Sequence, residues 1–185
     1  VSSIGGLFQY GRKYMYTPWQ GYNPSNNLGN QTADIPWQND THMPCPEGYR
    51  VPTRSELNSL LPKNQEIPGT YIAGNGEKIT ATLHVGEGTL TTPTGVTGTQ
   101  QYVKFTSEDT GRYLIIPLAG GKGDKSTTNN PSFGKRAVLW TSERNGCPGG
   151  YAWTYWLPFE GKETTAIAER QLQMEAFASL RCVKK

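Results

Sequence analysis

The strongest constraint on this chain is a two-residue alternation of apolar and polar side chains, which is clearest in residues 78–85. The apolar residues of one parity there are Ile79, Ala81, Leu83 and Val85, and the polar residues of the other are Thr80, Thr82 and His84. Side chains alternate between the two faces of a β-strand, whereas the apolar face of a helix recurs about every 3.6 residues. The segment is therefore predicted to be a strand with one buried face.

Several other segments are rich in β-branched and aromatic residues and predict further strands. They are residues 6–16, 100–106, 112–118, 137–141 and 151–159, while 86–99 predicts a Gly/Thr loop or hairpin and 120–134 an exposed loop. Gly (22 residues) and Pro (13 residues) are abundant, as in a turn-rich, mostly β protein. A helix bundle or a coiled coil is not expected.

Residues 151–156 carry large aromatic side chains on both parities. Tyr151, Trp153 and Tyr155 share one face of the expected strand, and Ala152, Thr154 and Trp156 share the other. One face is expected to belong to the core, so that at most the other serves a ligand.

Residues 166–180 are rich in good helix formers, yet their apolar residues alternate. One parity contains Ala166, Ala168, Leu172, Met174, Ala176, Ala178, Leu180 and Cys182, broken only by Arg170, and the other parity is polar with Ile167 and Phe177 as exceptions. Because burial in a tertiary fold usually outweighs a weak helical propensity, the alternation predicts two strands with a break near Glu175. The same parity places Cys182 on the core side with Leu180.

One helix start is well marked in the sequence. Thr53 can accept a hydrogen bond from the amide of Glu56, whose carboxylate can reach back to the amide of Thr53, as in a capping box. Leucines at positions 57, 60 and 61 supply an apolar face, and Pro62 ends the helix. Glu56 is therefore interpreted as a capping residue and not as a catalytic acid.

The net charge of +3 is carried by scattered pairs of basic residues, so a nucleic-acid partner is not expected. The longest apolar run, residues 113–119, contains Pro117 and is far shorter than the ~18 residues of a membrane-spanning helix. The chain begins at Val1 without signal-peptide features, so we expect any leader to be absent or removed and membrane contact to occur only through a missing anchor.

No sequence motif assigns catalytic residues. The chain contains no Gly-x-Ser-x-Gly elbow, no His-Glu-x-x-His and no Walker loop. His42, Cys45, Cys147 and Cys182 are a conceivable zinc set, but structural zinc ligands usually come in close pairs and two of these are isolated. We therefore expect no metal and no cofactor, and an enzyme with dispersed paired carboxylates remains an alternative.

Three separated motifs are similar to those of a known family. They read CPEGYRVPTRSEL at 45–57, LWTS at 139–142 and LRCVK at 180–184, and GLFQYGRK at 6–13 accompanies them. Together they resemble the Fibrobacter succinogenes major paralogous domain, which is found in surface and fimbria-associated proteins of Bacteroidetes-type bacteria. This sequence has Leu180 where the family usually has Val, and Thr141 where it usually has Ser.

The resemblance implies a single domain over residues 1–185, with a strand and irregular loop in 1–43 and the core in 44–185. The implied fold class is α+β, mostly β: a C-type-lectin-like fold with a small twisted antiparallel sheet, one or two short helices and long loops. The family's two motif cysteines correspond to Cys45 and Cys182, which implies a disulfide between them. Cys147 is then expected to be a spare thiol.

The implied function is a non-enzymatic recognition or adhesion module, extracellular at the bacterial cell surface, on the outer membrane or a fimbria. Its partner would be a glycan or a host or envelope protein. The candidate ligand residues are Trp19, Tyr22, Trp37, Asn39 and Asp40, because aromatic faces stack on sugar rings and polar groups bond hydroxyls.

Two further interpretations stay open. The aromatic residues of the 19–40 loop can instead fasten that loop onto the sheet, and the domain can be a structural or tip subunit of a fimbria or envelope assembly. The Glu-Pro-Asn and Gln-Pro-Asp tripeptides of calcium-dependent lectins are absent from the sequence, so calcium-mediated sugar binding is not expected.

Overall fold

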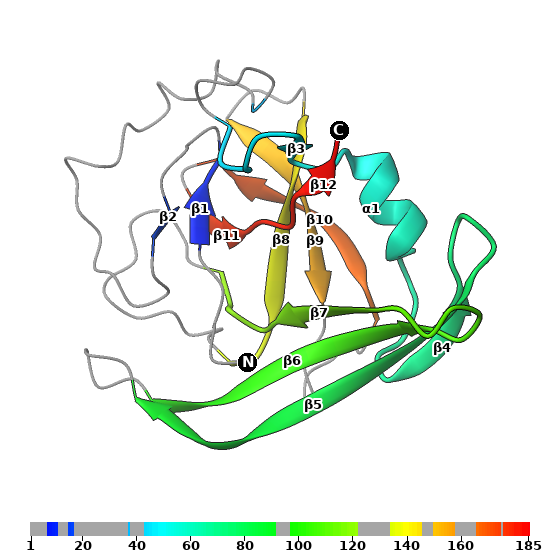
Figure 1. The fold of residues 1–185 in the computed structure, drawn as a ribbon. Coiled ribbons are helices and arrows are strands. Elements are labelled where there is room, and N and C mark those ends of the chain that lie inside the picture. The colour runs from blue at the N-terminus through cyan, green and yellow to red at the C-terminus, as the bar shows by residue number, and fades with distance from the viewer. Residues whose placement is uncertain are drawn as a thin grey trace.

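The computed structural model describes residues 7–10, 15–16, 37, 43–91, 97–121, 134–145, 150–157, 166–174 and 176–185. Within these residues the chain forms three β-sheets and one short helix (Figure 1). The elements in chain order are β1 (Leu7–Gln9), β2 (Met15–Tyr16), β3 (Tyr49–Arg50), α1 (Arg54–Leu60), β4 (Gly69–Ile72), β5 (Lys78–Thr91), β6 (Thr97–Ser107), β7 (Tyr113–Pro117), β8 (Ala137–Arg144), β9 (Tyr151–Leu157), β10 (Ala168–Gln173), β11 (Phe177–Ser179) and β12 (Val183–Lys184). The mostly β class is confirmed.

The largest sheet has six strands in the order β10-β9-β8-β11-β1-β2. Its pairs are antiparallel except β8 and β11, which run parallel. The two predicted C-terminal strands are confirmed as β10 and β11, but they are not neighbours. After the edge strand β10 the chain crosses to the other side of β8, so this sheet is mixed, whereas the expected small sheet was antiparallel.

The second sheet is a four-stranded meander, β4-β5-β6-β7, that runs across one end of the six-stranded sheet (Figure 1). The predicted strand at 78–85 is confirmed, and it continues to Thr91 in a long hairpin with β6. Ile79 and Ala81 are buried as their parity predicts, whereas Val85 is 57% exposed. Val85 is exposed because the pairing of β4 with β5 ends at Ala81, so the hairpin extends beyond its neighbouring strand.

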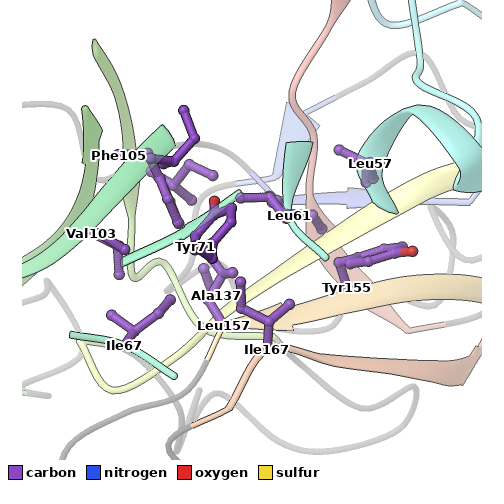
Figure 2. Packing of buried hydrophobic residues seen from close by; sticks show 14 of the residues in the cluster. Leu57, Leu61, Ile67, Tyr71, Val103, Phe105, Ala137, Tyr155, Leu157 and Ile167 are labelled. Carbon is purple, nitrogen blue, oxygen red and sulfur yellow. The ribbon is translucent and has the colours of Figure 1, made fainter. Parts of the chain in front are cut away.

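Two hydrophobic clusters cover the two faces of the six-stranded sheet. On β8, Ala137 and Leu139 belong to the first cluster, and Val138 and Trp140 belong to the second. The first cluster lies between this sheet, the meander and α1 (Figure 2). Its buried members are Leu57, Leu61, Ile67, Tyr71, Ala73, Ile79, Ala81, Val103, Phe105, Ile116, Leu118, Ala137, Leu139, Tyr155, Leu157 and Ile167.

The second cluster is richer in aromatic side chains, and its buried members are Tyr10, Trp37, Met43, Val51, Val138, Trp140, Ala152, Met174 and Ala178. On β9, Tyr155 packs in the first cluster and Ala152 in the second. Both faces of β9 are therefore partly covered by core residues. Its partly exposed aromatic side chains are Tyr151, Trp153 and Trp156.

Helix α1 begins as the sequence predicts. Thr53 is the N-cap, the amide of Glu56 donates to Thr53 Oγ1 at 3.2 Å, and the amide of Thr53 donates to Glu56 Oε2 at 2.9 Å. Both halves of the capping box are confirmed. The Arg50 guanidinium also bonds the Glu56 carboxylate, and these contacts lower the pKa of Glu56 to about 2, with the Arg50 hydrogen bond as the main cause.

The disulfide between Cys45 and Cys182 is confirmed, and it joins positions 137 residues apart. It lies beside the third sheet, in which β3 pairs antiparallel with β12. The last strand is thereby fixed next to the segment that leads into α1. The helix of the described residues is too short to cross a membrane.

Candidate functional site

A polar depression of about 360 Å³ opens beside α1. Residues of α1 with the turn after it and of strands β8, β9 and β10 line it, so four separate parts of the chain converge there. The lining residues are Arg54, Ser55, Asn58, Lys63, Glu143, Tyr155 and Glu169. Because charged and hydrogen-bonding groups dominate this lining, the depression suits a polar ligand better than an apolar one.

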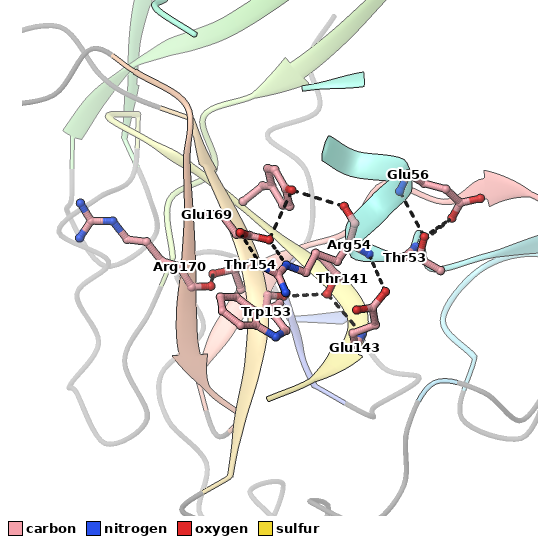
Figure 3. A network of polar contacts seen from close by, with 10 residues as sticks. Thr53, Arg54, Glu56, Thr141, Glu143, Trp153, Thr154, Glu169 and Arg170 are labelled. Atoms are coloured by element: carbon pink, nitrogen blue, oxygen red, sulfur yellow. Dashed lines mark hydrogen bonds and ion pairs between the residues drawn. The ribbon is translucent and has the colours of Figure 1, made fainter. Parts of the chain in front are cut away.

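Arg54 holds the site together, because it contacts three strands from the first turn of the helix (Figure 3). Its guanidinium donates to both carboxylate oxygens of Glu169, and the Nη2–Oε2 distance is 2.9 Å. Its guanidinium carbon lies 4.0 Å from the centre of the Trp153 ring. Its backbone amide donates to Glu143 Oε1 at 3.0 Å.

Tyr155 also lines the depression, and it is completely buried. The hydroxyl lies 3.3 Å from the carbonyl oxygen of Arg54 and 3.5 Å from Glu169 Oε1, so its single proton can serve either acceptor. Burial raises the pKa of this phenol well above its ordinary value. The phenol is therefore a neutral hydrogen-bond donor at neutral pH.

The electrostatics of the site favour an ionised Glu169. Its side chain is only 8% exposed, and the hydrogen bonds from Arg54 lower its pKa against the opposing effect of burial. The positive charge of Lys63 acts in the same direction. A carboxylate held in this way lacks the proton that a general acid must deliver at neutral pH. The site is thus arranged to accept and donate hydrogen bonds.

The structure places Trp37 in the core. Its side chain is 1% exposed, and its ring packs against Tyr10 and Trp140 with centroid distances of 4.7 and 6.3 Å. This position agrees with the interpretation that aromatic residues of the 19–40 loop fasten the loop onto the sheet. The other candidate ligand residues, Trp19, Tyr22, Asn39 and Asp40, lie outside the described residues.

Sequence reasoning did not select the residues of the depression. Arg54 lies inside the motif at 45–57, next to the capping Thr53, and Glu169 lies on the polar parity of the C-terminal alternation. The two are separated by 115 positions. Only the strand order and the position of α1 bring them together, and no local pattern encodes that.

Within the described part of the chain, no group of three or more His, Cys, Asp or Glu side chains is arranged to hold a metal. The zinc set considered above loses Cys45 and Cys182, because these two are joined to each other. Its other members, His42 and Cys147, lie outside the described residues.

A comparison with family models matches residues 6–184 to the Fibrobacter succinogenes major domain. Neither the curated proteins nor the solved structures contain a match to this chain. The matched range includes every residue that lines the depression.

Proposed function

Since this chain belongs to the Fibrobacter succinogenes major domain family, we propose that it is a non-enzymatic recognition or adhesion module of a bacterial surface protein, whose depression beside α1 binds a hydroxyl-rich ligand such as a glycan. The observation that carries the proposal is the convergence of fixed donors and acceptors on one depression. We further propose a C-type-lectin-like arrangement, which the single short helix of the described residues, the antiparallel meander and the disulfide between the segment before β3 and the C-terminal segment support.

Sugar hydroxyls both donate and accept hydrogen bonds, and this lining offers both functions. Asn58 and Lys63 are exposed and contribute an amide and an ammonium group, while Glu143 and Glu169 contribute carboxylate oxygens. Arg54 holds Glu169 and Trp153 in fixed positions, so little side-chain entropy is lost when a ligand binds. Preorganised polar groups of this kind favour orientation-specific hydrogen bonding.

The disulfide supports the extracellular part of the proposal. Disulfides form and persist mainly in secreted, periplasmic and surface proteins, because the cytosol keeps thiols reduced. The Cys45–Cys182 bridge fixes the final strand against β3 and the approach to α1. A domain that relies on this bridge is suited to an oxidising compartment at the cell surface.

The non-enzymatic part rests on how the carboxylates of the depression are used. Glycoside hydrolysis needs one protonated carboxyl group and one ionised carboxylate. Glu169 has a lowered pKa beneath Arg54, and Glu143 accepts the hydrogen bond of the helix amide at Arg54. Both carboxylates thus already have structural partners, which supports binding over proton transfer.

A glycan array followed by titration of any hit tests the proposal. Asn58→Ala and Lys63→Ala change exposed groups on the rim of the depression and are expected to weaken binding by about tenfold each, as loss of one good polar contact does. Lys184→Ala removes the same charge from β12 and is the matched control. Undiminished binding by both rim variants would remove the depression as the ligand site.

A second candidate function is a structural or tip subunit of an envelope assembly. Ile72 and Tyr113 are 61% and 64% exposed, and the strand register places both on the outer face of the meander. Large apolar side chains on one sheet face favour a protein contact. Pull-down of envelope proteins that is lost in Tyr113→Ser, with no glycan signal, would support this candidate instead.

A further inference from the structure

A second pairing of arginine and tryptophan lies on the opposite face of the β9–β10 pair. The guanidinium carbon of Arg136 lies 4.6 Å from the centre of the Trp156 ring, and that of Arg170 lies 5.1 Å from it. In Figure 3 the side chain of Arg170 points away from Arg54 and Glu169. We call Trp156, Arg136 and Arg170 the Trp156 cluster.

The strand register explains why both arginines reach the same ring. Trp156 is paired with Ala168 on β10 and with Val138 on β8. Arg170 and Arg136 are therefore its diagonal neighbours on either side, and diagonal neighbours on one sheet face are within reach of long side chains. One cation comes from β10, and the other comes from the residue just before β8.

The indole is fixed in position by a short chain of hydrogen bonds. Trp156 Nε1 donates to Thr154 Oγ1 at 2.9 Å, and the same hydroxyl donates to the carbonyl oxygen of Arg170 at 3.0 Å. Thr154 is completely buried. The ring, the hydroxyl and the backbone of β10 thus form one rigid platform beneath the two guanidinium groups.

Among the described residues, no carboxylate balances the charge of the cluster. Their ion pairs involve Arg50, Arg54 and Lys78, and neither Arg136 nor Arg170 takes part in one. Burial lowers the pKa of Arg136, and the charge of Arg170 lowers it further. Two like charges held on one ring repel each other, and a bound anion would relieve that repulsion.

We propose that the Trp156 cluster is a binding site for an oxyanion, namely the carboxylate or sulfate group of an acidic ligand. A guanidinium presents two parallel N–H groups that match two oxygens of such a group, and the guanidinium groups of Arg136 and Arg170 contact the same ring, so both can donate to one bound anion. The indole that both groups contact supplies an apolar surface for the carbon skeleton that bears the anion. This site lies on the opposite face from the depression and does not depend on the function proposed for it.

The test is a titration of the isotope-labelled domain, with the indole N–H resonance of Trp156 as a local readout. Trp156→Phe assigns that resonance among the five tryptophans. Glucuronate, inorganic sulfate and neutral glucose are the probes. We expect glucuronate to shift the resonance and glucose to leave it unchanged. A sulfate response as well shows that the free oxyanion suffices, and its absence shows that a carboxylate on a sugar is needed.

Charge-matched variants separate a specific site from general attraction. Arg170→Gln changes an exposed side chain and is expected to weaken glucuronate binding by about tenfold, as loss of a charge-assisted hydrogen bond does. Arg112→Gln, in the exposed turn before β7, removes the same charge elsewhere and is expected to leave binding within about twofold.

Three results would overturn the proposal. These are no anion-dependent shift of the Trp156 resonance, equal shifts with glucuronate and glucose, or equal weakening in Arg170→Gln and Arg112→Gln. Arg136→Gln provides a second variant, just before β8, and is expected to match Arg170→Gln. If Arg136→Gln does not fold, as judged by its circular dichroism, Arg170→Gln alone decides.

Discussion

Each face of the β9–β10 pair places arginine against tryptophan, but the two faces differ in how the positive charge is neutralised. On one face Arg54 covers Trp153, and Glu169 neutralises the guanidinium. On the other face two guanidinium groups approach Trp156, and no carboxylate of the described residues pairs with either. In the first arrangement the charge is neutralised within the protein, and the contacts stabilise the position of α1. The second leaves positive charge available to an external anion.

The same division extends into the two cores. Beneath the Trp153 face lies the first cluster, which is mostly aliphatic and is covered by α1 and the meander. Beneath the Trp156 face lies the second cluster, where Tyr10, Trp37 and Trp140 pack together and the disulfide-bonded Cys45 packs against the cluster. We infer that the first side is stabilised mainly by packing, and that the second depends also on a covalent bond.

The largest expected effect is on the second side. The double variant Cys45→Ser with Cys182→Ser opens a loop of 137 residues and should lower the free energy of unfolding by about 5 kcal/mol in the chain-entropy model. Urea denaturation of the oxidised wild type and the variant measures this difference. A loss of less than about 1 kcal/mol would contradict the inference that the second side depends on the bridge.

The next effect tests the first side. Leu157 is completely buried in the first cluster, and Leu157→Ala should lower the free energy of unfolding by about 3 kcal/mol through lost burial and the resulting cavity. The same substitution in the disulfide-free background asks whether the two faces are independent. Additive losses indicate independent sides, and strong non-additivity would show that they unfold as one coupled unit.

A smaller effect is expected for the ion pair of Arg54 and Glu169. Glu169→Gln keeps the shape of the side chain but removes the charge that Arg54 bonds, and should lower the free energy of unfolding by about 2 kcal/mol. Glu47→Gln, in an exposed turn, is the matched control and should change stability little. Chemical denaturation at neutral pH compares the two variants.

The same carboxylate predicts a pH dependence. The pKa of Glu169 is lowered in the folded state, chiefly by its hydrogen bonds with Arg54, so its stabilisation is present above the unfolded pKa of about 4.3 and is lost as the pH falls through the folded value. Thermal unfolding between pH 7 and pH 3 should therefore show a smaller loss in Glu169→Gln than in the wild type. If stability falls equally with pH in the wild type and in Glu169→Gln, protonation of Glu169 does not contribute to acid unfolding.

The comparison also marks the limit of what the sequence predicts. The alternation predicts β5, β10 and β11, and the capping pattern predicts the start of α1 at Thr53, because these signals depend on neighbouring residues. The family resemblance implied the disulfide. The Arg54–Glu169 pair and the Trp156 cluster depend on the order and register of β8, β9 and β10 and on the position of α1, and no short sequence pattern determines these.

The smallest expected effect is a gain in the free energy of unfolding, where the preceding variants lose it. Arg170→Gln should leave stability unchanged or raise it by up to about 0.5 kcal/mol at low salt, because it removes a repulsion between two partly solvated cations and breaks no ion pair of the described residues. Added sodium chloride should reduce the gain by screening. Thermal unfolding of Arg170→Gln and Arg54→Gln, in a buffer without oxyanions and at several salt concentrations, measures the stability change and its dependence on salt. A clear loss of stability in Arg170→Gln, similar to that in Arg54→Gln, would mean that the protein itself neutralises the charge on the Trp156 face, as it does on the Trp153 face.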